Sequence, residues 1–214
     1  MAALRQLISL ILLSVNFLDL SRAGTRMLEP PSRASLWRYG YNTPRNNWDD
    51  MTDCGGYERH HIKNGGNCGV CGDASDEPTP RRHEAGGELS PNPTPVKAFE
   101  TGSYLTVVME TSSSLFGHFE FRLCNISHNM ETPSQNCFDQ TQLTILESEL
   151  GTEYQIGSRQ GIHVLNLRLP TGVVCSHCIV QWTHKTGFTT NQESCLTCPG
   201  GESKCRACKG CGNQ

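Results

Sequence analysis

Cysteine restricts how this chain can fold more than any other residue type, because it occurs twelve times in 214 residues. Seven cysteines precede residue 180 and five follow it, so complete pairing within the chain requires at least one disulfide between the two groups. In an oxidising compartment, cysteines at this density form a disulfide framework. We therefore expect disulfides among Cys54, Cys68, Cys71, Cys124, Cys137, Cys175, Cys178, Cys195, Cys198, Cys205, Cys208 and Cys211.

Residues 1–23 predict a cleaved secretory signal peptide. Arg5 precedes an apolar run at 7–18, and Ser21 and Ala23 are small residues at the positions that a signal peptidase requires. The run is too short to span a bilayer. Cleavage after Ala23 would leave Gly24 as the first residue of a secreted, extracellular protein without membrane contact.

Residues 24–190 are expected to form one all-β domain, whose regular strands lie in its second half. Short runs at 104–109, 118–123, 142–146, 163–169 and 178–184 mostly alternate apolar and polar residues and are separated by Gly, Pro and Asn turns. This pattern favours an antiparallel β-sandwich. No amphipathic helix longer than three turns is indicated, and a short helical turn is expected at 32–38.

The tail, residues 191–214, has too few apolar residues to form a core of its own. Its two CxxC pairs would suggest zinc in a cytosolic protein, but the loop between them is short for a zinc ribbon, and the leader favours disulfides. The earlier CxxC pairs, at 68–71 and 175–178, are interpreted as structural bridges rather than redox pairs because neither lies in a βαβ pattern.

His83 lies in a loop that reads CGVCGDASDEPTPRRHEAGGE from Cys68 to Glu88. Two prolines and a Gly-Gly step exclude a continuous helix or central strand here. The loop therefore presents one imidazole beside a CxxC pair, which makes His83 a candidate metal ligand. The alternative is an exposed or hydrogen-bonded loop histidine.

Other functional classes find little support. The net charge of −3 gives no broad basic surface for nucleic acid. We find no nucleophile elbow, phosphate loop, HExxH helix or dinucleotide fingerprint. Asn125-Ile-Ser127 is an N-glycosylation sequon, so a secreted form is expected to be a glycoprotein at Asn125.

Several longer words of the sequence together resemble the type-4 chitin-binding domain of invertebrates, the lytic polysaccharide monooxygenases of auxiliary-activity family fifteen. The resemblance covers nearly all of the chain after residue 23. The words are RMLEPPSR at 26–33, SLWRYG at 35–40, CGGY at 54–57, CGVCGD at 68–73, RHEAGG at 82–87, FEFRLC at 119–124 and LPTGVVCSHCIVQW at 169–182.

The resemblance implies an immunoglobulin/fibronectin-like β-sandwich with long disulfide-linked loops and a flat face that binds chitin or a related insoluble polysaccharide. It also implies a single copper ion held by a histidine brace. The brace consists of the amine and imidazole of an N-terminal histidine plus a second histidine, which corresponds to His83. Gly24 stands at the first position, so only its amine could contribute. Two further sets of residues are expected near this site: Glu84 and Gln181 as supporting residues, and Tyr57 and Trp37 as contacts with sugar.

The family places an axial Tyr or Phe after a Gly-Cys-Gly-x-Gln word. Gly210–Gln214 resembles that word, and a second alignment puts Cys205 where the aromatic belongs, so either alignment lacks it. The tail is accordingly interpreted as the truncated end of the same domain. We expect a monomeric, chitin-binding protein that is weakly active or non-catalytic. The alternatives are an active copper monooxygenase cleaving chitin or cellulose, given with incorrect ends, and a Cys-rich extracellular structural protein.

Overall fold

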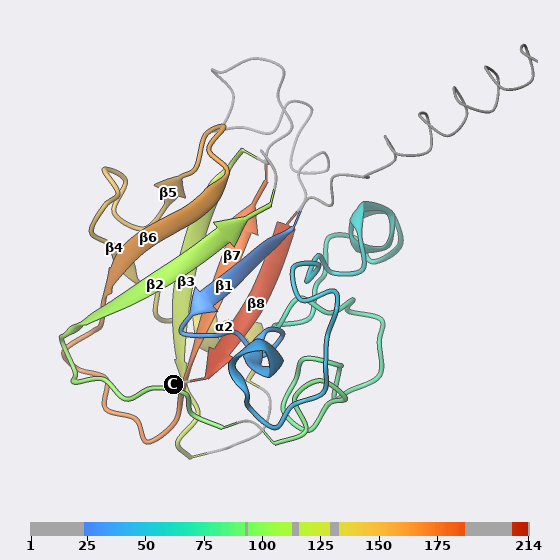
Figure 1. Ribbon diagram of the computed structural model, residues 1–214, viewed down its shortest axis with the longest axis horizontal. Coiled ribbons are helices and arrows are strands. Elements are labelled where there is room, and N and C mark those ends of the chain that lie inside the picture. The colour runs from blue at the N-terminus through green and yellow to red at the C-terminus, as the bar shows by residue number, and fades with distance from the viewer. Residues whose placement is uncertain (1–23, 93, 113–115, 129–132, 187–206, 214) are drawn as a thin grey trace, which may run out of the picture.

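Two four-stranded antiparallel sheets pack face to face (Figure 1). The computed structural model describes residues 24–92, 94–112, 116–128 and 133–186, and the backbone of 207–213. The first sheet has the order β1-β2-β6-β4 and the second β5-β3-β7-β8. The strands are β1 (Thr25–Glu29), β2 (Tyr104–Thr111), β3 (His118–Asn125), β4 (Thr144–Ile145), β5 (Tyr154–Gln155), β6 (Gly161–Arg168), β7 (Cys178–Lys185) and β8 (Ala207–Asn213). The predicted antiparallel β-sandwich is confirmed.

The main core lies between the two sheets and follows the alternation of the sequence. Phe119 and Phe121 of β3 point inward, as do Leu165 and Leu167 of β6, and all four side chains are fully buried. Each such side chain stabilises the fold by about 1.5–3 kcal/mol relative to an exposed position. Of the expected run at 142–146, the strand comprises only Thr144–Ile145.

The loop layer, residues 30–92, covers the outer face of the second sheet beside β7 and β8 (Figure 1). It contains a short 3₁₀ helix at Leu36–Tyr39 and a single π-helical segment at Glu58–Lys63. Val70 of this layer packs with Ile179 of β7 and with Phe138 of α2 (Gln135–Asp139). Seven of the eight residues of β7 are consequently buried, whereas β6 exposes alternate side chains.

Disulfides tie the irregular segments together. The bonds are Cys54–Cys68, Cys124–Cys137 and Cys175–Cys178. Cys71 is disulfide-bonded as well. The predicted signal peptide and the tail cysteines Cys195, Cys198 and Cys205 lie outside the described residues, and the side chains of Cys208 and Cys211 are not described.

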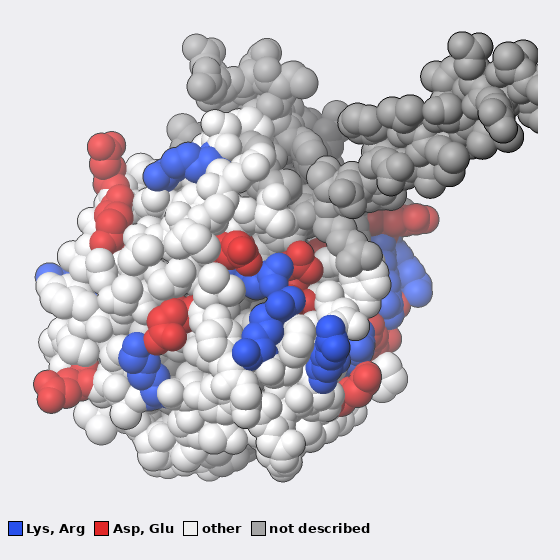
Figure 2. Space-filling view, in the orientation of Figure 1, with Lys and Arg blue, Asp and Glu red and all other residues white. Residues whose placement is uncertain are grey.

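The described part of the chain contains no helix that is both long and apolar enough to cross a membrane. The face of the molecule seen in Figure 2 carries Lys, Arg, Asp and Glu side chains intermixed rather than gathered by sign. This agrees with the small net charge of −3.

Candidate functional site

His83 is held by one carboxylate of its own loop. Its Nδ1 lies 2.7 Å from Asp73 Oδ1, and its backbone N–H donates to Asp73 Oδ2 at 3.0 Å. Because a carboxylate can only accept, Nδ1 carries the ring proton, and the lone pair of the neutral imidazole is on Nε2. Carboxylates orient metal-binding imidazoles in this way.

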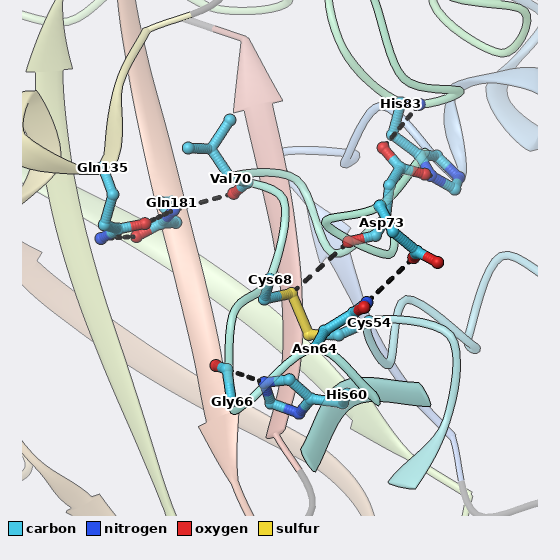
Figure 3. The surroundings of a disulfide bond; sticks show 11 residues. Cys54, His60, Asn64, Gly66, Cys68, Val70, Asp73, His83, Gln135 and Gln181 are labelled. Carbon is cyan, nitrogen blue, oxygen red and sulfur yellow. Dashed lines mark hydrogen bonds and ion pairs between the residues drawn. A yellow bond between two sulfur atoms is a disulfide. The ribbon is translucent and has the colours of Figure 1, made fainter. Parts of the chain in front are cut away.

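Asp73 is placed by the turn that follows the Cys54–Cys68 disulfide (Figure 3). Its carbonyl accepts from the Gly69 N–H at 2.9 Å, and an isolated bridge pairs Cys68 with Ala74. The CxxC word at 68–71 therefore has a structural role at the candidate site. It shapes the turn that contains Asp73, and the Asp73 carboxylate fixes the tautomer of His83.

Asn46 contacts the other ring nitrogen. Its Nδ2 lies 3.3 Å from His83 Nε2, and its Oδ1 accepts from the Trp48 N–H at 3.1 Å. Asn46 and His83 are both buried, at 5% and 8% exposure, while Trp48 is 49% exposed. The exposed ring of Trp48 thus lies two positions along the chain from Asn46, whose side chain contacts Nε2 of His83.

Arg33 supports the same loop from inside the protein. It is 2% exposed and donates through Nη1 to the His83 carbonyl at 3.3 Å. Burial lowers its pKa to about 10, and the charge of Glu84 opposes that shift. Glu84 in turn accepts from Arg81, at 2.8 Å from the backbone N–H and 2.7 Å from Nη1. Glu84 therefore supports the loop through its charge and its hydrogen bonds to Arg81.

Gly24 immediately precedes β1 and lies in a tight environment. Its N–H donates to Ser112 Oγ at 2.8 Å, and its carbonyl accepts from Ser112 N at 2.9 Å. A Cβ added at Gly24 would lie 2.5 Å from Asp50 Oδ2. Asp50 lies 3.6 Å from Arg26, which also pairs with Asp49 at 3.2 Å. A larger residue at position 24 requires Asp50 to move.

The remaining candidates lie among other partners. Gln181 donates to the Val70 carbonyl at 2.8 Å and pairs with Gln135 (Figure 3). The guanidinium groups of Arg38 and Arg45 lie 4.5 and 5.3 Å from the ring centroid of Trp37. The ring of Tyr57 lies 5.1 Å from that of His61. Sequence reasoning did not single out Asp73 or Asn46, although Asp73 ends one of the words that carry the resemblance.

A second polar cluster contains the residues His118, Glu120 and Glu153, whose donor atoms converge within 4.8 Å. Among the described His, Cys, Asp and Glu residues, this is the group of three close enough to hold a metal ion. However, Lys185 Nζ lies 2.6 Å from Glu120, and Arg122 Nη2 lies 2.7 Å from it. Burial would raise the pKa of Glu120, but hydrogen bonds from His118 and Lys185 and nearby positive charge hold it at about 2. Two resident cations disfavour a metal ion here.

Comparison with known proteins identifies the class. The family of lytic polysaccharide mono-oxygenases, described as cellulose-degrading, matches residues 25–199, so the chain belongs to this family. A solved structure of the lytic polysaccharide monooxygenase AA15 from Thermobia domestica, in the Cu(I) state, is 33% identical with a TM-score of 0.78. The similarity covers 88% of this chain and 96% of that one. No curated protein matches.

Proposed function

We propose that this protein is a secreted, monomeric polysaccharide-binding member of the lytic polysaccharide monooxygenase family, with chitin as its first candidate ligand, and that its copper site is incomplete. The observation that carries the proposal is the contrast between its two brace positions. His83 retains an oriented imidazole, whereas Gly24 offers no side chain and Asp50 lies where one would begin. The family and the structural match support the polysaccharide-active scaffold.

The residues present do not fit a two-imidazole copper site. Copper(II) favours a planar set of nitrogen ligands. His83 supplies one imidazole, and its Nε2 would have to release the Asn46 amide. Cleavage after Ala23 would turn the Gly24 N–H, which now donates to Ser112, into an amine. This set is weaker than a full brace, so we expect little or no oxidative cleavage.

Binding to an insoluble polysaccharide is the function that the loop layer can still perform. Aromatic rings stack on the apolar faces of sugars, and Trp48 combines an exposed ring with a position beside Asn46. We add Trp48 to the sequence-predicted contacts Trp37 and Tyr57. The predicted leader at 1–23 supports the proposed secretion, and the sequon supports the proposed modification at Asn125.

Depletion assays with chitin and with cellulose test the proposal. The wild-type protein should be depleted by at least one of them, and Trp48→Ala should weaken binding about tenfold, which corresponds to about 1.4 kcal/mol. Tyr104→Ala is the matched control, because Tyr104 is also 49% exposed but lies on β2, away from the loop layer. Trp37→Ala and Tyr57→Ala test the other two rings. No depletion by either polymer would instead favour the Cys-rich structural role.

The alternative of an active monooxygenase is favoured by one observation, the Asp73 contact that leaves the His83 lone pair on Nε2. Copper titration with product analysis in the presence of a reductant separates the two functions. The unmodified chain should bind Cu(II) weakly and release no oxidised oligosaccharides. Gly24→His combined with Asp50→Gly should raise copper affinity by orders of magnitude, more than Gly24→His alone, and His83→Ala should abolish the gain. Tight copper binding and oxidised products from the unmodified chain would contradict the proposal.

A further inference from the structure

Asn125 is the last residue of β3, at the opposite end of that strand from His118. Its side chain is exposed, and it pairs in register with Cys178, the second cysteine of the Cys175–Cys178 disulfide. The sequon Asn125-Ile-Ser127 therefore lies directly beside the loop at 169–177, which joins β6 to β7 and contains Cys175 of this disulfide.

Hydrogen bonds join the sequon to that loop. Asn125 Nδ2 donates to the Val174 carbonyl at 3.2 Å. Ser127 Oγ accepts from the Ser176 N–H at 2.9 Å and from the His177 N–H at 3.3 Å. Both polar residues of the sequon therefore contact the loop, so a group attached at Asn125 would emerge next to Val174.

The same loop presents uncovered apolar surface. Val174 is 80% exposed, the highest value among the large hydrophobic residues of the described chain. It lines a cavity of about 260 Å³ together with Phe99, Leu169 and Pro170. A group that covers exposed apolar surface stabilises the protein, because it removes that surface from water.

We propose that Asn125 carries an N-linked glycan whose first sugar packs over Val174 at the mouth of this cavity. In the transfer, Nδ2 attacks the anomeric carbon of a lipid-linked oligosaccharyl diphosphate, the bond from that carbon to the diphosphate breaks, and one amide proton leaves. The substituted Nδ2 keeps one N–H, which can still donate to the Val174 carbonyl. That contact holds the sugar beside the valine. The inference requires secretion but does not depend on polysaccharide binding.

Three forms are compared: the protein secreted from eukaryotic cells with the complete glycan, the same protein trimmed enzymatically to a single N-acetylglucosamine, and the protein secreted while glycan transfer is inhibited, which keeps Asn125 unmodified. Mass spectrometry should find Asn125 modified. The first two forms should have the same melting temperature, and that of the bare form should be about 2–4 °C lower. A shift of this size is typical of one partly covered aliphatic side chain in a domain of this size. Amide exchange at Ser176 and His177 should quicken only in the bare form.

Val174→Ser should remove most of the difference among the three forms. Val164→Ser is the matched control, since Val164 is a 55% exposed valine on β6 of the other sheet, and it should leave the difference intact. An unmodified Asn125 in the secreted protein overturns the proposal, and so does equal melting of all three forms. Equal effects of the two valine substitutions would also overturn it. None of these outcomes bears on whether the protein binds chitin.

Discussion

The sandwich and the loop layer are stabilised by different chemistry. Between the sheets, residues such as Phe121 and Leu165 form an apolar interior. In the loop layer, Arg33 and Asp73 are almost as deeply buried, at 2% and 6% exposure, and each has a polar partner. An apolar interior tolerates changes that preserve volume, whereas a buried polar group must keep its partner. The scaffold should therefore tolerate more sequence variation than the site.

The largest expected effect is on the sandwich itself. Phe121→Ala removes a fully buried ring and should lower the free energy of unfolding by about 3–5 kcal/mol. Chemical denaturation monitored by Trp182 fluorescence measures it. Phe121→Leu, which conserves more of the volume, should lose much less. Similar losses from both changes would contradict packing as the cause.

The sandwich could be predicted from the sequence because apolar and polar residues mostly alternate along its longer strands. The runs around β2, β3, β6 and β7 were predicted close to their observed bounds. β2 and β6 bury one face with a period of two, whereas β7 is buried on both faces. β5, with two residues, is too short to show a period, and β4 occupies only part of its predicted run. The partners of His83 show no periodicity at all: Asp73 lies ten residues away, and Asn46 lies 37 away. His83 was found through its motif, but its surroundings depend on contacts that only the folded loop creates.

The second prediction tests the loop layer through its disulfide. Replacing Cys54 and Cys68 by Ser releases a bond between residues 14 positions apart and should cost about 3 kcal/mol. The same change should shift the position of Asp73, so the NMR signal of the His83 ring should move. If the signal of His83 stays unchanged despite the lost stability, the turn does not depend on the disulfide.

The third prediction concerns the Asp73 carboxylate. Asp73→Ala leaves the His83 N–H and Nδ1–H without their acceptor and should cost about 1.5–3 kcal/mol. Asp76→Ala is the control in the same loop, because that carboxylate is exposed, and it should change stability little. Equal effects of the two variants in thermal denaturation would show that burial of the Asp73 pair is unimportant.

The fourth prediction concerns the buried histidines of the sandwich, whose effect is small per pH unit. Burial, together with the charges of His118 and His163, lowers the pKa of His184 to about 4, against a hydrogen bond to Phe116 that raises it. Burial likewise lowers the pKa of His163. Between the ordinary value of 6.5 and about 4, the unfolded state binds more protons than the folded one, so stability falls as the pH falls.

For His184 this loss is at most about 1.4 kcal/mol per pH unit. Urea titrations at several pH values measure it. His184→Gln should flatten the slope, whereas a control variant at the exposed His128, His128→Gln, should leave it unchanged. Below pH 4.5 the unfolded state begins to bind a proton at Glu120, whose pKa in the folded protein is about 2, so stability should continue to fall after the contribution of His184 ends near pH 4. An unchanged slope in His184→Gln would mean that another group causes the pH dependence.

β7 couples the unfolding of the sandwich to that of the loop layer. One of its faces completes the interior of the sandwich through Val180 and Trp182, and the other contacts the loop layer through Ile179 and Gln181. Neither region can open at β7 without exposing a strand that the other needs. We therefore expect the sandwich and the loop layer to melt in a single calorimetric transition while the disulfides are intact, so that damage at the site is felt as a loss of stability across the whole domain.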